Sequence, residues 1–155
     1  MVVKVEFLNP FITAAADVLR AEAGTEVKRG ALSLQRSAVT TQDVTVLIGI
    51  VGDAEGIVMY SMSEPMALAI VSQMIGEQLA EFDELAQSGI AELGNVISGQ
   101  AATRLSQTGV NVQISVPTLI LGRGATISTL DFQRLVVPLE TAMGTMEIHL
   151  ALRPK

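Results

Sequence analysis

A helical period of apolar residues is the strongest pattern in the chain, and it runs from Phe82 to Gln107. Residues three or four positions apart fall on one face of an α-helix. The apolar residues at this spacing are Phe82, Ala86, Ile90, Leu93, Ile97 and Ala101. The residues nearly opposite them are Ser88, Glu92, Asn95 and Gly99. The pattern predicts a long helix with a buried stripe and a polar outer face.

A second helix is predicted near the start of the chain. Asn9 followed by Pro10 is typical of a helix N-cap and a first helical turn, and Gly24 is typical of a helix end. Glu6 and Asn9 have the Glu-x-x-Asn spacing found in the long helix. The residue before a proline avoids the α conformation, so we interpret Glu6 and Asn9 as a cap that precedes this helix.

Runs of apolar and β-branched residues on both sides of short turns predict two β-hairpins. The paired runs are residues 44–51 with 56–62, and 131–140 with 145–152. Ser63 is expected to cap a short helix that ends at Gly76. Further extended segments are predicted at residues 27–39 and 110–116, and at 118–121 and 125–128 around a turn at Gly122-Arg123-Gly124.

The two halves of the chain repeat one order of elements: a helix, a glycine, an extended segment and a hairpin. The halves are approximately residues 8–62 and 82–152, within a single domain over residues 1–155. At an offset of 86 residues, Asn9 matches Asn95 and Leu19 matches Leu105. This predicts an α+β fold with long helices packed on one antiparallel sheet. A parallel α/β sheet would need more evenly interleaved helices.

Composition excludes several kinds of function. Ten Lys and Arg against sixteen Asp and Glu give a net charge of −6, which argues against nucleic-acid binding. With no cysteine, disulfides, thiolate metal sites and thiol nucleophiles are excluded. We expect the single histidine, His149, to face solvent beside Glu147, with no metal site. The apolar runs are too short to cross a bilayer, so a cytoplasmic location without membrane insertion is predicted.

The outer face of the predicted long helix has an unusual composition. Glu92 and Asn95 stand three positions apart, and their side chains meet on the helix surface. The helix also contains three glycines, at positions 89, 94 and 99, each of which costs about 0.5–1 kcal/mol relative to alanine. Small residues let a partner come close, which favours a flat docking surface. The alternative is that the glycines serve helix packing and Glu92 is merely solvated.

The segment from Ser88 to Gly99 resembles the phosphatase helix of the CheC/CheX/FliY family, which dephosphorylates the chemotaxis response regulator CheY. The family pattern is an Asp or Ser, a Glu four positions later, an Asn three beyond that, and a proline a little over twenty residues downstream. Ser88, Glu92, Asn95 and Pro117 match it, and the opening residues 5–11 also resemble CheX proteins. The resemblance covers essentially the whole chain.

The resemblance implies an aspartyl-phosphate phosphatase with a CheC-like fold. Asn95 would orient the attacking water, and Glu92 would contact the lysine of the receiver domain. Ser88, Ala91 and Gly99 would belong to the docking surface. Mg²⁺ is expected in the partner receiver domain, and no cofactor is expected on this chain.

The branch of the family also follows from the resemblance. The N-terminal helix, taken as residues 10–23, has no Glu and Asn at matching positions, so the chain presents one helical pair. A single pair favours CheX over CheC, and CheX resemblance implies a homodimer. A different class of function stays open: a non-catalytic interaction module related to the flagellar switch proteins, because fold alone does not imply activity.

Overall fold

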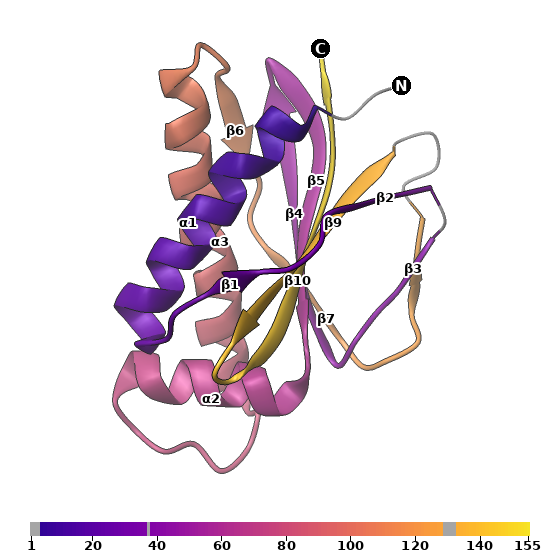
Figure 1. The fold of residues 1–155 in the computed structure, drawn as a ribbon. Helices are drawn as coiled ribbons and strands as arrows, with labels where there is room; N and C mark the ends of the chain where they lie inside the picture. The colour runs from indigo at the N-terminus through magenta and orange to yellow at the C-terminus, as the bar shows by residue number, and fades with distance from the viewer. Residues whose placement is uncertain (1–3, 37, 129–132) are drawn as a thin grey trace.

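The computed structural model describes residues 4–36, 38–128 and 133–155, which form three helices and ten strands (Figure 1). The helices are α1 (Val5–Ala23), α2 (Glu64–Ile75) and α3 (Glu84–Gln107). The strands are β1 (Lys28–Arg29), β2 (Ser33–Gln35), β3 (Val39–Thr40), β4 (Val44–Gly52), β5 (Ala54–Met62), β6 (Val112–Ile114), β7 (Thr118–Leu121), β8 (Thr126–Ile127), β9 (Arg134–Thr141) and β10 (Gly144–Pro154).

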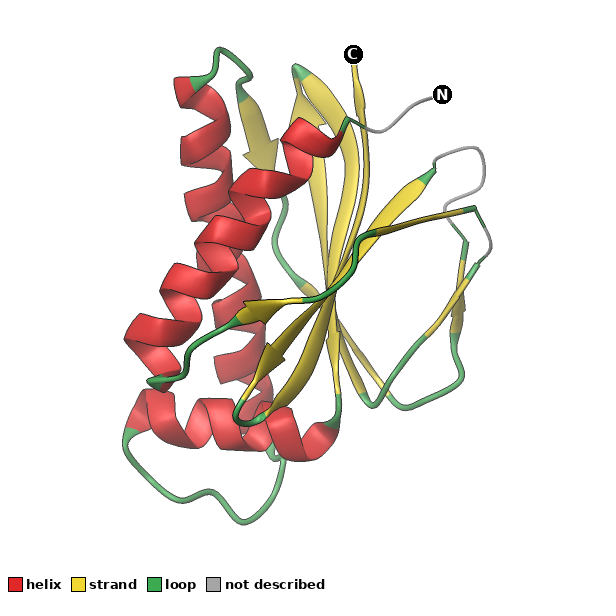
Figure 2. Ribbon diagram, in the orientation of Figure 1, coloured by secondary structure: helices red, strands yellow, loops and turns green. Residues whose placement is uncertain are grey.

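One antiparallel sheet organises the fold. Among the described residues, eight strands form this sheet in the order β1-β9-β10-β5-β4-β6, with β2 also pairing with β9 and β7 with β4. Strands β3 and β8 form a separate two-stranded sheet. The helices pack together on one side of the large sheet (Figure 2). The expected α+β fold is therefore confirmed, and a parallel sheet is excluded.

The two predicted hairpins are confirmed as β4–β5 and β9–β10. Residues 131 and 132 of the second predicted hairpin, and Ser37 of the extended segment 27–39, lie outside the described residues. Strands β5 and β10 pair with each other along eight positions, from Glu147 opposite Ser61 to Pro154 opposite Ala54. This central pairing joins the hairpin of the first half to the hairpin of the second.

The extended segments expected at residues 118–121 and 125–128 form strands β7 and β8, which do not pair with each other. Strand β7 pairs with β4, and β8 pairs with β3. The intervening turn is held at the residue before β4, because Arg123 forms an ion pair with Asp43 and Gly122 donates to the Asp43 carbonyl at 2.8 Å. The Glu64 backbone N–H and the Arg123 guanidinium together hold the pKa of Asp43 below its usual value. The Gly-Arg-Gly segment is thus a structural turn.

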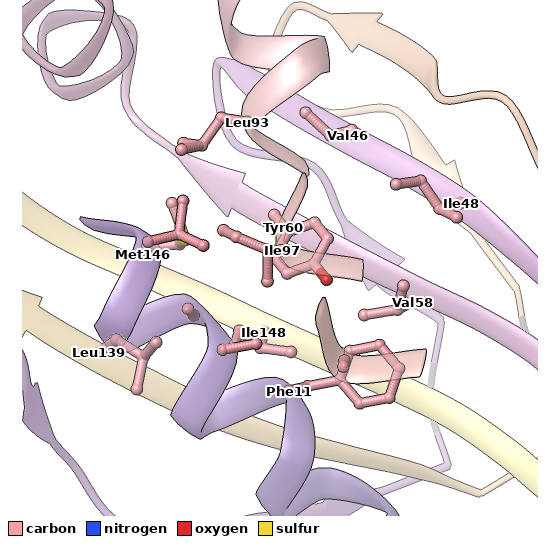
Figure 3. Packing of buried hydrophobic residues seen from close by; sticks show 14 of the residues in the cluster. Phe11, Val46, Ile48, Val58, Tyr60, Leu93, Ile97, Leu139, Met146 and Ile148 are labelled. Carbon is pink, nitrogen blue, oxygen red and sulfur yellow. The ribbon is translucent and has the colours of Figure 1, made fainter. Parts of the chain in front are cut away.

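The hydrophobic core lies between the helices and the sheet. Side chains from α1 and α3 face those from the central strands, with Phe11 and Ile97 close to Tyr60, Val58 and Ile148 (Figure 3). All five of these side chains are 1% exposed or less. Their burial, at about 25 cal/mol per Å² of apolar surface, fixes how α1 and α3 are rotated on the sheet.

Helix α1 begins earlier than the sequence pattern predicts. It starts at Val5, Lys4 occupies the N-cap position without a side-chain cap, and Asn9 and Pro10 lie inside the helix. A proline inside a helix costs about 3 kcal/mol, whereas burying one Phe or Leu side chain gains about 1.5–3 kcal/mol. Phe7 and Leu8 are 7% and 0% exposed, so their burial outweighs the proline penalty. The interpretation of Asn9 as a cap is wrong.

The opposite face of the sheet is buried around His149, which corrects the expectation that this side chain faces solvent. The segments that carry β2, β3 and β8 extend on the side away from the helices (Figure 1). His149 is 3% exposed, and Nε of the fully buried Arg134 donates to its Nδ1 at 3.1 Å. Because a guanidinium only donates, the His149 proton is on Nε2, which lies 3.3 Å from Glu147 Oε1. The His149 hydrogen bond is the main cause of the lowered pKa of Glu147.

Replacing His149 with leucine is expected to lower the free energy of unfolding by about 1–3 kcal/mol, because Arg134 loses a buried acceptor. His149→Asn places an amide oxygen near the position of Nδ1 and is expected to recover part of that loss. Urea unfolding of the wild type and both variants measures the difference. Equal stability of the leucine and asparagine variants would show that the hydrogen bond contributes nothing.

Candidate functional site

Helix α3 is fixed at its start by a side-chain cap. The Asp83 carboxylate accepts a hydrogen bond from the Ala86 N–H at 3.0 Å, so the helix begins at Glu84, two residues later than predicted. The predicted stripe within the helix is buried, as the exposures of Ala86, Ile90, Leu93, Ile97 and Ala101 show. Phe82 precedes the helix and packs against the core partly buried. This packing sets which face of α3 points outward.

The candidate pair lies on that outer face. Glu92 is exposed and Asn95 is half-buried, and neither side chain points into the core. Of the neighbouring candidates, Ser88 is exposed, while Ala91 and Gly99 are half-buried. Across the described ranges, neither Glu92 nor Asn95 has a hydrogen bond or an ion pair to another side chain or backbone group. Both polar ends are therefore available to a partner.

Two of the three glycines in α3 serve packing rather than docking. A Cβ at Gly89 would lie 2.7 Å from Cγ1 of Val71 in α2, and a Cβ at Gly94 would lie 2.7 Å from Cγ1 of Val46 in β4. At Gly99 a Cβ would meet open space. The alternative interpretation, helix packing, thus explains Gly89 and Gly94. The docking interpretation remains for Gly99.

Ser98 also belongs to the buried side of α3. It is 0% exposed, and its Oγ lies 2.7 Å from the Tyr60 hydroxyl. Burial raises the pKa of Tyr60, so this phenol stays neutral and hydrogen-bonded. The Tyr60–Ser98 bond links the middle of α3 to β5, close to where Gly94 rests on Val46. This hydrogen bond fixes the position of α3, and with it Glu92 and Asn95, relative to the sheet.

Apolar side chains are exposed on α3 and in the loop between β6 and β7, two strands that contact this helix. Leu85 is 52% exposed and precedes Ser88 and Glu92 on the same helical face. Val116, directly before Pro117, is 84% exposed. Strand β7, which begins after Pro117, contacts α3 and pairs with β4 beside Val46. A polar pair with exposed apolar neighbours is typical of a protein-docking surface.

Helix α1 carries a second Glu-x-x-Asn pair, which corrects the prediction of a single helical pair. Glu6 and Asn9 are both exposed and both lie within α1. The sequence did not indicate that Asn9 is helical, because the residue before a proline avoids the α conformation. The signal that could have revealed it is the apolar period of Phe11, which continues backwards to Phe7, four positions earlier.

Two further properties concern the described part of the chain. Its helices are all too short or too polar to span a lipid bilayer. No three His, Cys, Asp or Glu side chains in the described ranges come together as a metal site.

The fold is that of CheC-like proteins. A CheC-like superfamily protein from Shewanella sp. PV-4 has a TM-score of 0.88 and 30% identity, over 97% of this chain and 99% of that chain. The family model described as chemotaxis phosphatase CheX matches residues 44–140. The CheY-P phosphatase CheX of Thermotoga maritima is 36% identical over 123 residues, 79% of each chain. The chain belongs to the chemotaxis phosphatase CheX family.

A solved structure of a relative includes its partner. In the CheX–CheY–BeF₃–Mg²⁺ complex from Borrelia burgdorferi, the matching chain has a TM-score of 0.81 and 27% identity, over 97% of this chain and 99% of that chain.

Proposed function

We propose that this chain hydrolyses the phosphoaspartate of a CheY-like receiver domain, with Glu92 and Asn95 as the acting pair. The observation that carries this proposal is that both side chains stand on the outer face of α3 without an intramolecular partner. The Thermotoga maritima relative is named a CheY-P phosphatase, and the Borrelia burgdorferi relative is in complex with CheY, which supports the substrate class.

The reaction needs alignment more than covalent chemistry. A water oxygen forms a bond to phosphorus while the bond from phosphorus to the aspartyl oxygen breaks and its electron pair returns to the carboxylate. The products are the free aspartate and inorganic phosphate, which takes the water's proton. Such a transfer is accelerated mainly by positioning and charge stabilisation. In the proposal, Mg²⁺ is held by the receiver and not by this chain.

Asn95 suits the positioning of water. Its neutral amide both donates and accepts hydrogen bonds, so it can hold a water without adding negative charge beside the phosphoryl group. Glu92 carries negative charge, which a phosphoryl group would repel. In the proposal, its carboxylate contacts the receiver lysine, and this ion pair removes that repulsion. Ser88, Ala91 and Gly99 form the proposed docking surface around the pair.

Asn95→Ala is expected to lower turnover about 100-fold, because misplacing a reacting group has effects of that size. Phosphate release from a phosphorylated, Mg²⁺-loaded receiver measures it, with receiver binding followed separately. Receiver binding is expected to stay close to that of the wild type. Glu92→Ala is expected to lower turnover as well.

The matched control is Gln100→Ala, since Gln100 is an exposed carboxamide on the same helix, five positions beyond Asn95. At about 100° per residue, it points to a different side. Its turnover is expected to equal that of the wild type. A wild type that binds the receiver without accelerating hydrolysis, or an unchanged Asn95→Ala rate, would favour the non-catalytic interaction module instead.

Two further expectations belong to this proposal. We propose that the chain acts in the cytoplasm together with its receiver partner. The homodimer that the CheX resemblance implies stays a prediction, and sedimentation equilibrium of the purified chain measures it.

A further inference from the structure

We propose that Tyr60 is a positioning residue for phosphoaspartate hydrolysis and that it acts through α3 on Asn95. This inference rests on the function proposed above for Glu92 and Asn95. The Tyr60 hydroxyl lies 2.7 Å from Ser98 Oγ, and both residues are 1% exposed or less. A buried hydroxyl without a partner is costly, so each of these two groups keeps the other in place.

Tyr60 contacts α3 at two points that are one helical turn apart. Its hydroxyl reaches Ser98, and its Cδ2 lies 3.5 Å from the place that a Cβ of Gly94 would take. The ring lies beside Ile97 in the core (Figure 3). Asn95 follows Gly94 directly and therefore belongs to the turn between the two contacts. A rigid ring that meets both ends of this turn fixes its position on the sheet and the direction in which Asn95 points.

Glycines on both sides of this turn make its backbone depend on the hydrogen bond to Tyr60. Gly94 and Gly99 enclose the segment from Asn95 to Ser98, and glycine has more backbone freedom than any other residue. A Cβ at Gly99 would meet open space, so side-chain packing does not restrain the helix there. The Tyr60–Ser98 bond, one residue before Gly99, supplies a restraint at that end of the turn.

The comparison with α1 shows that helix packing in this fold does not require a buried hydroxyl pair. At the offset of 86 residues, Ser98 matches Ile12, which packs partly buried against the core. Strand β10, the neighbour of β5, faces the core with apolar side chains: Met146, Ile148, Leu150 and Leu152. Within the described ranges, α1 therefore packs on the sheet through apolar contacts, and the Tyr60–Ser98 pair belongs to the helix that carries the proposed site.

Tyr60→Phe tests this inference with the smallest change to the core, since it removes the hydroxyl and keeps the ring. Phosphate release from a phosphorylated, Mg²⁺-loaded receiver gives kcat and KM for each variant. We expect Tyr60→Phe to lower kcat about tenfold and to change KM less than about twofold, because a misplacement of about 1 Å costs about 100-fold in rate and the loss of one restraint moves Asn95 by less. Ser98→Ala removes the same hydrogen bond from the other side and is expected to have the same effect.

A second buried hydroxyl pair provides the matched control, Ser61→Ala. The Ser61 and Thr45 hydroxyls lie 3.1 Å apart, but they join β5 to β4 and not to α3. Ser61→Ala is expected to lower the urea midpoint about as much as Tyr60→Phe and to leave kcat unchanged. When Tyr60→Phe and Ser98→Ala are combined, kcat is expected to equal that of either single variant, because the same bond is lost in all three.

The outcomes separate this inference from the function proposed for α3. If Asn95→Ala lowers turnover but Tyr60→Phe and Ser98→Ala keep the wild-type kcat, the positioning role is refuted and the α3 site stands. An equal loss of kcat in Ser61→Ala also refutes that role, because general destabilisation would then explain the effect. If Asn95→Ala has the wild-type rate, both the α3 site and the role of Tyr60 are refuted. Circular dichroism shows whether each variant is folded, and Ser98→Ala decides the question if Tyr60→Phe is not.

Discussion

Adding a single methyl group at Gly56 is expected to unfold most of the protein. Gly56 has φ of 153°, and a Cβ there would lie 1.8 Å from the Ala151 carbonyl oxygen of β10. The clash is with backbone, so no side-chain rotation relieves it. Gly56 pairs with Leu152 in the central strand pair, and that pairing would have to open. We expect a loss of about 4 kcal/mol or more, a large part of the total stability of a domain.

The control for Gly56→Ala is Gly124→Ala. Gly124 also has positive φ, 86°, but a Cβ there would meet nothing within 4 Å. Gly124→Ala therefore measures the cost of an alanine at positive φ without a clash, about 1–2 kcal/mol of stability. Urea midpoints and the soluble yield of the two variants measure the difference. A Gly56→Ala variant as stable as Gly124→Ala would refute the close approach of β5 and β10.

Gly94→Val is expected to destabilise the protein by about 1–3 kcal/mol and to lower its phosphatase turnover at the same time. The space for a Cβ at Gly94 is already taken by Val46 Cγ1 at 2.7 Å and by Tyr60 Cδ2 at 3.5 Å. A larger side chain pushes α3 away from the sheet. Because Glu92 and Asn95 lie directly beside this contact on the same helix, the proposed pair is displaced with it.

Gly99→Ala should behave in the opposite way. A Cβ at Gly99 faces open space, and alanine is better than glycine inside a helix by about 0.5–1 kcal/mol. Thermal unfolding of Gly94→Val, Gly99→Ala and the double variant Gly94→Val with Val46→Ala tests both expectations. The double variant is expected to recover part of the lost stability. If Gly94→Val and Gly99→Ala unfold at the same temperature, packing is not the reason for glycine at position 94.

The regular spacing of apolar residues correctly predicted the elements that bury one face against the core. The buried stripe of α3 and the alternation of the two hairpins were both correct, because each reflects contact with one core. The cap at Ser63 was readable for a local reason: its hydroxyl oxygen accepts the Met66 N–H within the first helical turn.

The errors arose where tertiary contacts outweighed a local preference. A residue before a proline disfavours the α conformation, yet the burial of Phe7 and Leu8 stabilises a helix that continues through Asn9 and Pro10. His149 looked solvated because alternation shows only that two faces exist, and a single sequence does not show that the buried Arg134 bonds His149 on the second face. No local pattern in the sequence shows that β7 pairs with β4, where Leu119 lies opposite Val46 and packs against the core.

The candidate site was partly predictable. The spacing of Glu92 and Asn95 and the resemblance to the family pointed to α3, and the structure places both side chains on the outer face; their roles stay predictions. The glycines were harder to interpret, since a glycine under a neighbouring valine and a glycine facing a partner look alike in sequence. Only the positions of Val71 and Val46 distinguish Gly89 and Gly94 from Gly99.

The position of β10 has a consequence for how the chain reaches its native state during synthesis. This strand is the last of the sheet in chain order, yet it lies between β5 and β9 near the middle of the sheet. Until β10 has left the ribosome, β5 presents an unpaired edge, and α1 has only part of its final packing surface. The nascent protein therefore has an open sheet edge from the synthesis of β5 to that of β10, and chaperone contact or aggregation is expected in that interval.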